Sequence, residues 1–310
     1  MRAYLAATTV VLLVLVSVFS VLSDVFMSWP NMLNIALASS TIGILAIGAA
    51  FVIGAAGLDL SVGSLMALCS VVAILCVQQY SMHWSIVPLI ALASGITVGA
   101  FNGWLIGYIG IPALIVTLGM LSIARGLAYI FSNGRPVYGL PEPLLFVGQG
   151  DIIGVPMPVI VFLVLGMSVH VLLRHTAFGQ YALAIGDSET AVRNAGIRVM
   201  RHRLMMYTMS GAIAAIAGIV YVARVNAVDP NAGTMYELRA ITAAIIGGTA
   251  LFGGRASIAG AIIGALIMGV LGNGLGLLNV SSYYQHVAIG SVLILAVAAG
   301  QWKVRHYDYT

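Results

Sequence analysis

The sequence predicts an all-α polytopic membrane protein, with about ten transmembrane helices in a single domain that covers residues 1–310. Hydrophobic residues make up 61% of the chain, and its mean hydropathy is +1.07. Only 7% of the residues are charged, whereas a typical soluble domain has about 25%. Most of the surface must therefore face lipid, and 310 residues are enough for ten spans of roughly 20 residues with short connections.

The apolar stretches between turn signals define the predicted spans in order. They are residues 4–22, 41–56, 64–79, 85–108, 112–131, 157–173, 204–222, 240–252, 257–278 and 286–302. The first stretch has the position of a signal peptide, but it is long for one and lacks a small-residue cleavage site before Asp24. We therefore interpret it as a transmembrane helix.

The distribution of basic residues predicts that both termini are cytoplasmic. With the N-terminus inside, nine basic residues lie on the cytoplasmic side: Arg2, Arg174, Arg193, Arg198, Arg201, Arg203, Arg255, Lys303 and Arg305. Three lie outside: Arg135, Arg224 and Arg239. This asymmetry follows the positive-inside rule, so orientation explains the net charge of +4 better than binding of nucleic acid does.

Two predicted connections are longer than turns. The external one, residues 132–156, contains four prolines and five glycines, a density that predicts no regular helix. The cytoplasmic one, residues 175–203, contains Gly186-Asp187-Ser188-Glu189, which is typical of a helix start, and Gly196, which is typical of a helix end. A two-turn helix is therefore expected on the cytoplasmic face.

Glycine recurs at helical spacing in two predicted spans. Gly95, Gly99, Gly103 and Gly107 follow one another at every fourth position, and Gly260 and Gly264 repeat that spacing. Such small-residue faces allow membrane helices to pack closely. The pattern predicts a compact bundle and does not point to a substrate.

The sequence argues against several kinds of chemistry. The six histidines have no metal-ligand spacing, and no nucleophile motif is found, so neither a metal site nor a catalytic residue is predicted. The only lysine, Lys303, does not lie in a phosphate-binding loop. Because ionisable residues are also scarce within the spans, ion-coupled transport is disfavoured. Any energy for transport would come from a partner.

The segment Gly57-Leu58-Asp59-Leu60-Ser61-Val62-Gly63-Ser64 interrupts two apolar runs. Two glycines, an acid and hydroxyl groups predict a break between two helices. In one interpretation Asp59 or Ser61 caps the following helix. In the other, these polar groups line a solute path, since non-helical backbone at membrane depth normally borders a cavity.

The same segment resembles the signature of ABC-importer permeases of the monosaccharide, ribose-type class, which share a family with branched-chain amino-acid permeases. Further similar stretches occur in the family's order between residues 30 and 300. They are Arg125-Gly126-Leu127-Ala128-Tyr129, Ser132-Asn133-Gly134, Tyr236-Glu237-Leu238, Gly247-Gly248-Thr249, Gly253-Gly254, Asn273-Gly274-Leu275 and Tyr283-Tyr284-Gln285.

The cytoplasmic loop is similar to the segment that couples such permeases to their ATPase. The resemblance implies this coupling role for Gly186, Asp187, Glu189, Thr190, Ala191, Arg193 and Gly196. The sequence departs from the usual pattern at Gln180, at Asp187-Ser188 and at Arg255-Ala256, so docking is better supported than any single contact.

The resemblance implies a permease subunit that translocates a monosaccharide, a ribose-like pentose or a hexose, across the bacterial inner (plasma) membrane. Its implied partners are a second permease copy or a paralogue, a separate ABC ATPase subunit that binds ATP and Mg²⁺, and a periplasmic or surface sugar-binding protein. No cofactor is expected on this chain. Asp59, Ser61 and Asn273 are the candidates for the substrate pathway. The alternatives are a stand-alone channel or ion-coupled carrier, and a branched-chain amino-acid permease.

Overall fold

The computed structural model describes residues 2–307, and the side chains of residues 4–298, and the chain is mostly helical. The long helices are α1 (Arg2–Leu22), α2 (Trp29–Gly54), α3 (Val62–Gln79), α4 (Val87–Trp104), α5 (Ala113–Ser132), α7 (Met157–His175), α10 (Val199–Val225), α12 (Ile258–Leu277) and α13 (Ser282–Tyr307). The shorter ones are η1 (Trp84–Ile86), η2 (Leu105–Ile109), α6 (Glu142–Gln149), α8 (Ala177–Asp187), α9 (Glu189–Asn194) and α11 (Tyr236–Ile246). Two small antiparallel pairs join β1 (Val137–Tyr138) to β4 (Ala227–Val228), and β2 (Asp151–Ile152) to β3 (Val155–Pro156).

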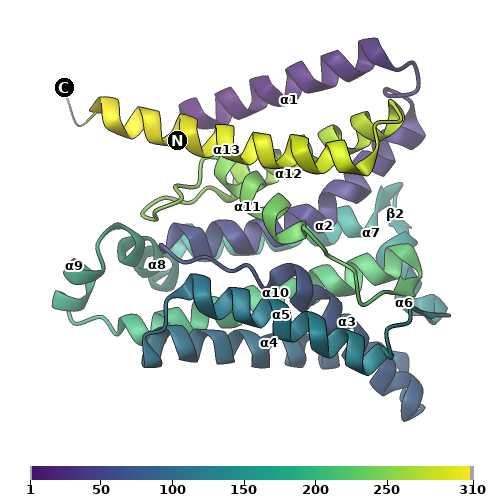
Figure 1. The fold of residues 1–310 in the computed structure, drawn as a ribbon, viewed down its shortest axis with the longest axis horizontal. Helices are drawn as coiled ribbons and strands as arrows, with labels where there is room; N and C mark the ends of the chain where they lie inside the picture. Colours follow the sequence, from purple (N-terminus) through teal and green to yellow (C-terminus); the bar gives the residue numbers. More distant parts are fainter. Residues whose placement is uncertain (1, 308–310) are drawn as a thin grey trace.

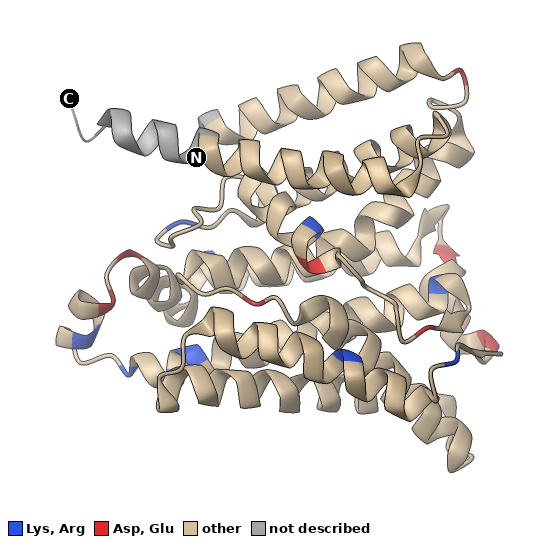
Figure 2. Ribbon diagram, in the orientation of Figure 1, with Lys and Arg blue, Asp and Glu red and all other residues tan. Residues whose placement is uncertain are grey.

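The long helices lie side by side and run roughly along one common direction (Figure 1). Helices α8 and α9 lie at one end of this bundle, and α6 and the β2–β3 pair lie at the other. Helix α1 begins and α13 ends at the α8–α9 end. Figure 2 shows that most of the described charged residues lie near the two ends, with few between them.

The predicted fold class is confirmed. Within the described residues, eight helices are long and apolar enough to cross a membrane: Tyr4–Leu22, Trp29–Gly54, Val62–Gln79, Trp84–Ile109, Ala113–Ser132, Met157–His175, Val199–Val225 and Ile258–Leu277. Helix α13 adds an apolar stretch at Ser282–Ala298. The chain is therefore a polytopic α-helical membrane protein.

The predicted span at residues 240–252 is wrong. Its helix, α11, has 11 residues and ends at Ile246, which gives it a length of about 17 Å, too short to cross a bilayer. Gly248, Gly253 and Gly254 follow in left-handed backbone conformations with φ of 91°, 91° and 77°. These turns lead the chain to the start of α12. We call α11 a half-helix, because it is too short to cross the membrane.

Two other boundaries also differ from the prediction. Helix α2 begins at Trp29 rather than at residue 41, with Pro30 in its first turn. Proline is tolerated there because N–H groups of the first turn have no acceptor within the helix. The external connection, expected to have no regular helix, contains α6, which Pro141 precedes and whose first turn contains Pro143. Prolines are compatible with a helix when they lie at its start. The prediction of no regular helix was wrong because it counted these prolines without regard to their position.

The core surrounds the second half of α2, which is buried from Ser39 to Gly54 and packs against α7, α10, α11 and α12. Helices α4 and α10 cross closely through the predicted glycine stripe. A Cβ atom added at Gly95 or Gly99 would overlap a carbonyl oxygen of α10, and one added at Gly264 would overlap a carbonyl oxygen of α11. The stripes therefore act in helix packing, as predicted.

Candidate functional site at the helix break

The predicted break between two helices lies inside the bundle, at residues 55–61 between α2 and α3. Ala56 has a left-handed conformation with φ of 57°, which ends α2. The carbonyl oxygen of Leu58 accepts hydrogen bonds from the Tyr207 hydroxyl of α10 at 3.2 Å and from the Thr117 hydroxyl of α5 at 3.4 Å. These bonds satisfy backbone that has left the helix, as non-helical backbone at membrane depth requires.

Asp59 is the buried acid of this break, with 4% of its surface exposed. Its Oδ1 accepts hydrogen bonds from the Ser61 backbone N–H at 3.0 Å and from the Ser61 hydroxyl at 2.6 Å, and its Oδ2 accepts one from Ser210 of α10 at 2.7 Å. The Asn102 amide of α4 donates to the Ser61 hydroxyl at 3.2 Å. Asp59 and Ser61 therefore connect the start of α3 to α4 and α10. The Ser61 side chain accepts no hydrogen bond from the first turn of α3, so these contacts tie helices together and do not cap α3.

Asn273, the third pathway candidate, lies in a separate polar contact. Its side-chain amide donates to Oδ1 of Asn31 at 2.8 Å, and the amide of Asn31 donates back to Oδ1 of Asn273 at 3.0 Å. This reciprocal pair joins α12 to α2. The structure thus brings Asp59 and Ser61 together but not Asn273, whose role in the pathway stays a prediction.

A second break faces the first one. Residues 229–235 lead into the half-helix α11, and a Cβ atom added at Gly63 of α3 would overlap the Gly233 carbonyl and the Glu237 carboxylate. The N-terminal ends of α3 and α11 therefore meet within the bundle. The prediction that Arg239 lies on the outer side is wrong, because Arg239 belongs to α11, whose start meets α3 within the bundle. Hydropathy does not reveal a chain that enters the bundle before its helix begins.

Arg125 of α5 holds this second break in place. Its Nη1 donates to the carbonyl oxygen of Ala232 at 2.8 Å and also to that of Pro230, and the Tyr129 hydroxyl donates to the side chain of Asn231. One turn of α5 thus binds three residues of a non-helical segment. The sequence singled out Arg125 and Tyr129 within one motif, but gave no sign of what they bind.

Replacing Arg125 with glutamine is expected to release residues 229–235 without unfolding the bundle. The shorter amide cannot hold both carbonyl groups, so backbone N–H groups of this segment should exchange with solvent about tenfold faster, the effect of losing one charged hydrogen bond of ~1.5 kcal/mol. Hydrogen exchange of the purified protein measures this. Arg135→Gln, in the exposed outer connection, is the matched control, and equal exchange in both variants would contradict the assignment.

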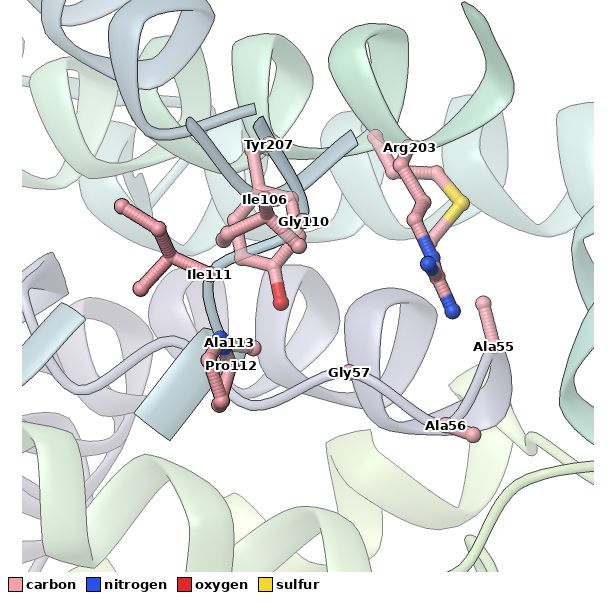
Figure 3. Close-up of a pocket in the computed structure, with 11 residues that line it drawn as sticks. Ala55, Ala56, Gly57, Ile106, Gly110, Ile111, Pro112, Ala113, Arg203 and Tyr207 are labelled. Atoms are coloured by element: carbon pink, nitrogen blue, oxygen red, sulfur yellow. The ribbon is translucent and has the colours of Figure 1, made fainter. Parts of the chain in front are cut away.

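A cavity of about 170 Å³ adjoins the first break (Figure 3). Its lining comes from the break, from the end of η2 and the start of α5, and from α10: Ala55, Ala56, Gly57, Ile106, Gly110, Ile111, Pro112, Ala113, Arg203, Met206 and Tyr207. Figure 3 shows the Arg203 guanidinium and the Tyr207 hydroxyl pointing toward the backbone of the break. Every other lining side chain is uncharged.

A short helix is present in the loop of residues 175–203, as predicted, but this helix, α9, has six residues. Gly186 and Asp187, which were expected to start it, belong to the end of α8. The Ser188 hydroxyl accepts a hydrogen bond from the Ala191 N–H at 3.3 Å, and Gly196 ends the turn with φ of 79°. Asp187, Thr190, Ala191, Arg193 and Gly196 are exposed, and Glu189 is half-buried. Glu189 forms ion pairs with Arg193 and Arg203, both at 2.5 Å.

Helix α8 precedes α9 and was not predicted from the sequence. Gly179, Ala182 and Ile185 are its buried residues, a spacing of three that marks one face of a helix. Gly186 lies so close to the end of α2 that an added Cβ atom would overlap the Gly54 carbonyl and the Gly254 N–H. The last turn of α8 is therefore packed directly against the backbone at the first break.

Broken helices that meet inside a helical membrane bundle are typical of membrane transporters. The comparisons with known proteins identify the kind of transporter. The chain belongs to the family described as the branched-chain amino acid transport system permease component, whose sequence model matches residues 31–297.

Several relatives are similar over nearly their whole length. The ribose import permease protein RbsC of Escherichia coli (strain K12) is 41% identical over 95% of this chain and 92% of that protein. RbsC of Bacillus subtilis (strain 168) is 39% identical over 94% and 91%, and the D-allose transport system permease protein AlsC of Escherichia coli (strain K12) is 36% identical over 94% and 90%.

Proposed function

We propose that this chain is the permease subunit of an ATP-binding-cassette importer and carries a monosaccharide, a ribose-like pentose or a hexose, across the bacterial inner (plasma) membrane. Support for the sugar comes from relatives named for ribose and D-allose. A neutral sugar needs only uncharged donors and acceptors, and the cavity at the break offers the Tyr207 hydroxyl and backbone groups.

The observation that carries the proposal is the connection between α8–α9 and the helix break. The exposed side chains of α9 would provide a surface for an ATPase subunit. Gly186, in the last turn of the preceding helix α8, lies against the end of α2. Displacement of α8–α9 would therefore reach residues 54–57 directly. In this mechanism ATP and Mg²⁺ bind to the partner, and the bundle alternates between two packed states.

The proposed partners follow from this mechanism. A second copy of the permease, or a paralogue, would complete the path. A separate ATPase subunit would dock on the α8–α9 end, and a periplasmic or surface-tethered protein would deliver the sugar to the opposite end. On this assignment the α8–α9 end and both chain termini face the cytoplasm.

Reconstitution tests the proposal against a carrier that works alone. In vesicles containing only this chain, we expect no ribose uptake down or against a gradient. Adding the ATPase subunit and the binding protein should give uptake that requires ATP. Gradient-driven uptake by the chain alone would contradict the proposal, and leucine uptake by the complete system would assign the amino-acid branch of the family instead.

Charge reversal at Glu189 should uncouple the complete system. Glu189→Arg replaces both ion pairs of α9 with repulsion and is expected to lower sugar-stimulated ATP hydrolysis about tenfold, the effect of a ~1.4 kcal/mol change in coupling free energy. Gly186→Pro should act in the same direction. Asp24→Arg, an exposed acid in the connection between α1 and α2 at the edge of the bundle, is the matched control. Unchanged hydrolysis in Glu189→Arg would exclude α9 as the coupling helix.

A further inference from the structure

Glu189 joins two arginines that lie in very different places. Its Oε1 binds Arg193 on α9 itself, whose side chain is 64% exposed, and its Oε2 binds Arg203 on α10, whose side chain is 32% exposed. Only Arg203 of the two lines the cavity at the helix break. One carboxylate of the exposed helix thus holds the single charged side chain of the cavity wall.

Arg203 lies across the cavity from the helix break, so its ion pair with Glu189 links α9 to the cavity. Figure 3 shows its guanidinium directed at Ala55, the residue at which α2 ends. The last carbonyl groups of a helix carry a partial negative charge that attracts a cation. The guanidinium therefore lies between the Glu189 carboxylate, which binds it, and the partial negative charge at the end of α2.

Helix α9 is the part of this arrangement that is held least firmly. It buries one side chain, Val192, which packs with Ile185 and Val199. Helix α8, in contrast, has three buried residues and the tight contact at Gly186. The ion pair with Arg203 is therefore a principal connection between α9 and the bundle.

We propose that Arg203 is a gating residue at the cytoplasmic mouth of the cavity, and that Glu189 positions it. With the ion pair intact, the guanidinium closes the space between α10 and the end of α2. When α9 moves, Glu189 moves with it, the guanidinium follows, and the cavity opens toward the cytoplasm. The inference rests on the proposed function in naming the ATPase subunit as the partner that moves α9 and in placing the α8–α9 end in the cytoplasm.

Thiol labelling of the chain alone, in membrane vesicles, tests the gate without the ATPase. Cys69→Ala and Cys76→Ala provide a background without cysteines, and Ala113→Cys places one thiol in the cavity wall. The reagent is N-ethylmaleimide, which is neutral, so the charge of Arg203 does not alter its approach. A separate Ala195→Cys protein, with its thiol exposed just after α9, normalises the intrinsic reactivity.

Loss of the pair should open the cavity. Glu189→Gln and Arg203→Gln are each expected to speed labelling of the cavity thiol about fivefold, which corresponds to ~1 kcal/mol at 1.4 kcal/mol per tenfold. Arg193→Gln is the matched control, because it removes the other ion pair of the same carboxylate and leaves the cavity wall intact. In that Arg193→Gln background, the exchanged pair Glu189→Arg with Arg203→Glu should restore slow labelling.

Two results would overturn the inference. One is labelling of the cavity thiol at the parental rate in both Glu189→Gln and Arg203→Gln. The other is equal acceleration by Arg193→Gln, which would mean that loosening α9 in general exposes the cavity. If Arg203→Gln does not fold, Glu189→Gln decides alone, since its carboxylate lies outside the cavity wall. Neither result depends on ATP, so a failed gate and a failed importer assignment remain distinguishable.

Discussion

Replacing Gly99 with valine should strongly destabilise the bundle. Gly99 lies where α4 crosses α10, and a Cβ atom there would overlap the backbone carbonyl of Tyr207. A backbone carbonyl within a helix cannot turn aside, so the two helices must separate along their whole contact. We expect a loss of about 3 kcal/mol or more in the free energy of unfolding, at the upper end of overpacking effects.

Thermal unfolding of the purified protein in detergent measures this effect. Gly119→Val is the matched control, because Gly119 is an exposed residue of α5 and a Cβ atom there meets nothing within 4 Å. It should change stability by no more than about 0.5 kcal/mol. A parental melting temperature in Gly99→Val would contradict the close crossing of α4 and α10.

The second large effect is expected at Asp59. Asp59→Leu leaves the Ser61 backbone N–H and the Ser210 hydroxyl without their acceptor in a buried site. Unsatisfied buried groups of this kind cost about 1–3 kcal/mol each, so we expect a loss of at least ~3 kcal/mol in the free energy of unfolding and no uptake by the assembled system.

Asp59→Asn separates hydrogen bonding from charge. Its amide oxygen still accepts from Ser61, and its amide nitrogen can donate to the Ser210 hydroxyl, so stability and uptake should stay near those of the parent. Asp24→Leu, an exposed acid outside the spans, controls for the leucine. An asparagine variant as unstable as the leucine variant would show that the negative charge itself is needed.

The sequence reveals features that depend on short-range pattern. The start and end of α9 follow from Ser188 and Gly196, because caps act within one turn. The glycine stripe of α4 follows from its four-residue spacing, because that spacing places small residues on one helix face. Asp59 and Ser61 were grouped correctly because they are two residues apart.

Features that depend on contacts between residues far apart in the chain could not be predicted from the sequence. Apolar composition made residues 240–252 look like a span, although the left-handed turns after Ile246 send the chain back. The start of α2 was also placed too late, and its polar residue Asn31 is satisfied by distant and local partners: its amide donates to the Phe26 carbonyl at 2.8 Å and to the side chain of Asn273. Arg203 counted only as one more cytoplasmic charge, because its place in the cavity wall depends on where α10 lies.

The meeting of α3 and α11 also has an electrical consequence. Each of the two helices directs the positive end of its dipole into the interior of the bundle, and each has a carboxyl group there: Asp59 binds the backbone before α3, and Glu237 lies in the first turn of α11. The side-chain oxygens of these two residues offset part of the positive potential at the two N-termini. The two helix ends therefore do not combine into a strong site for an anion, which suits a neutral solute.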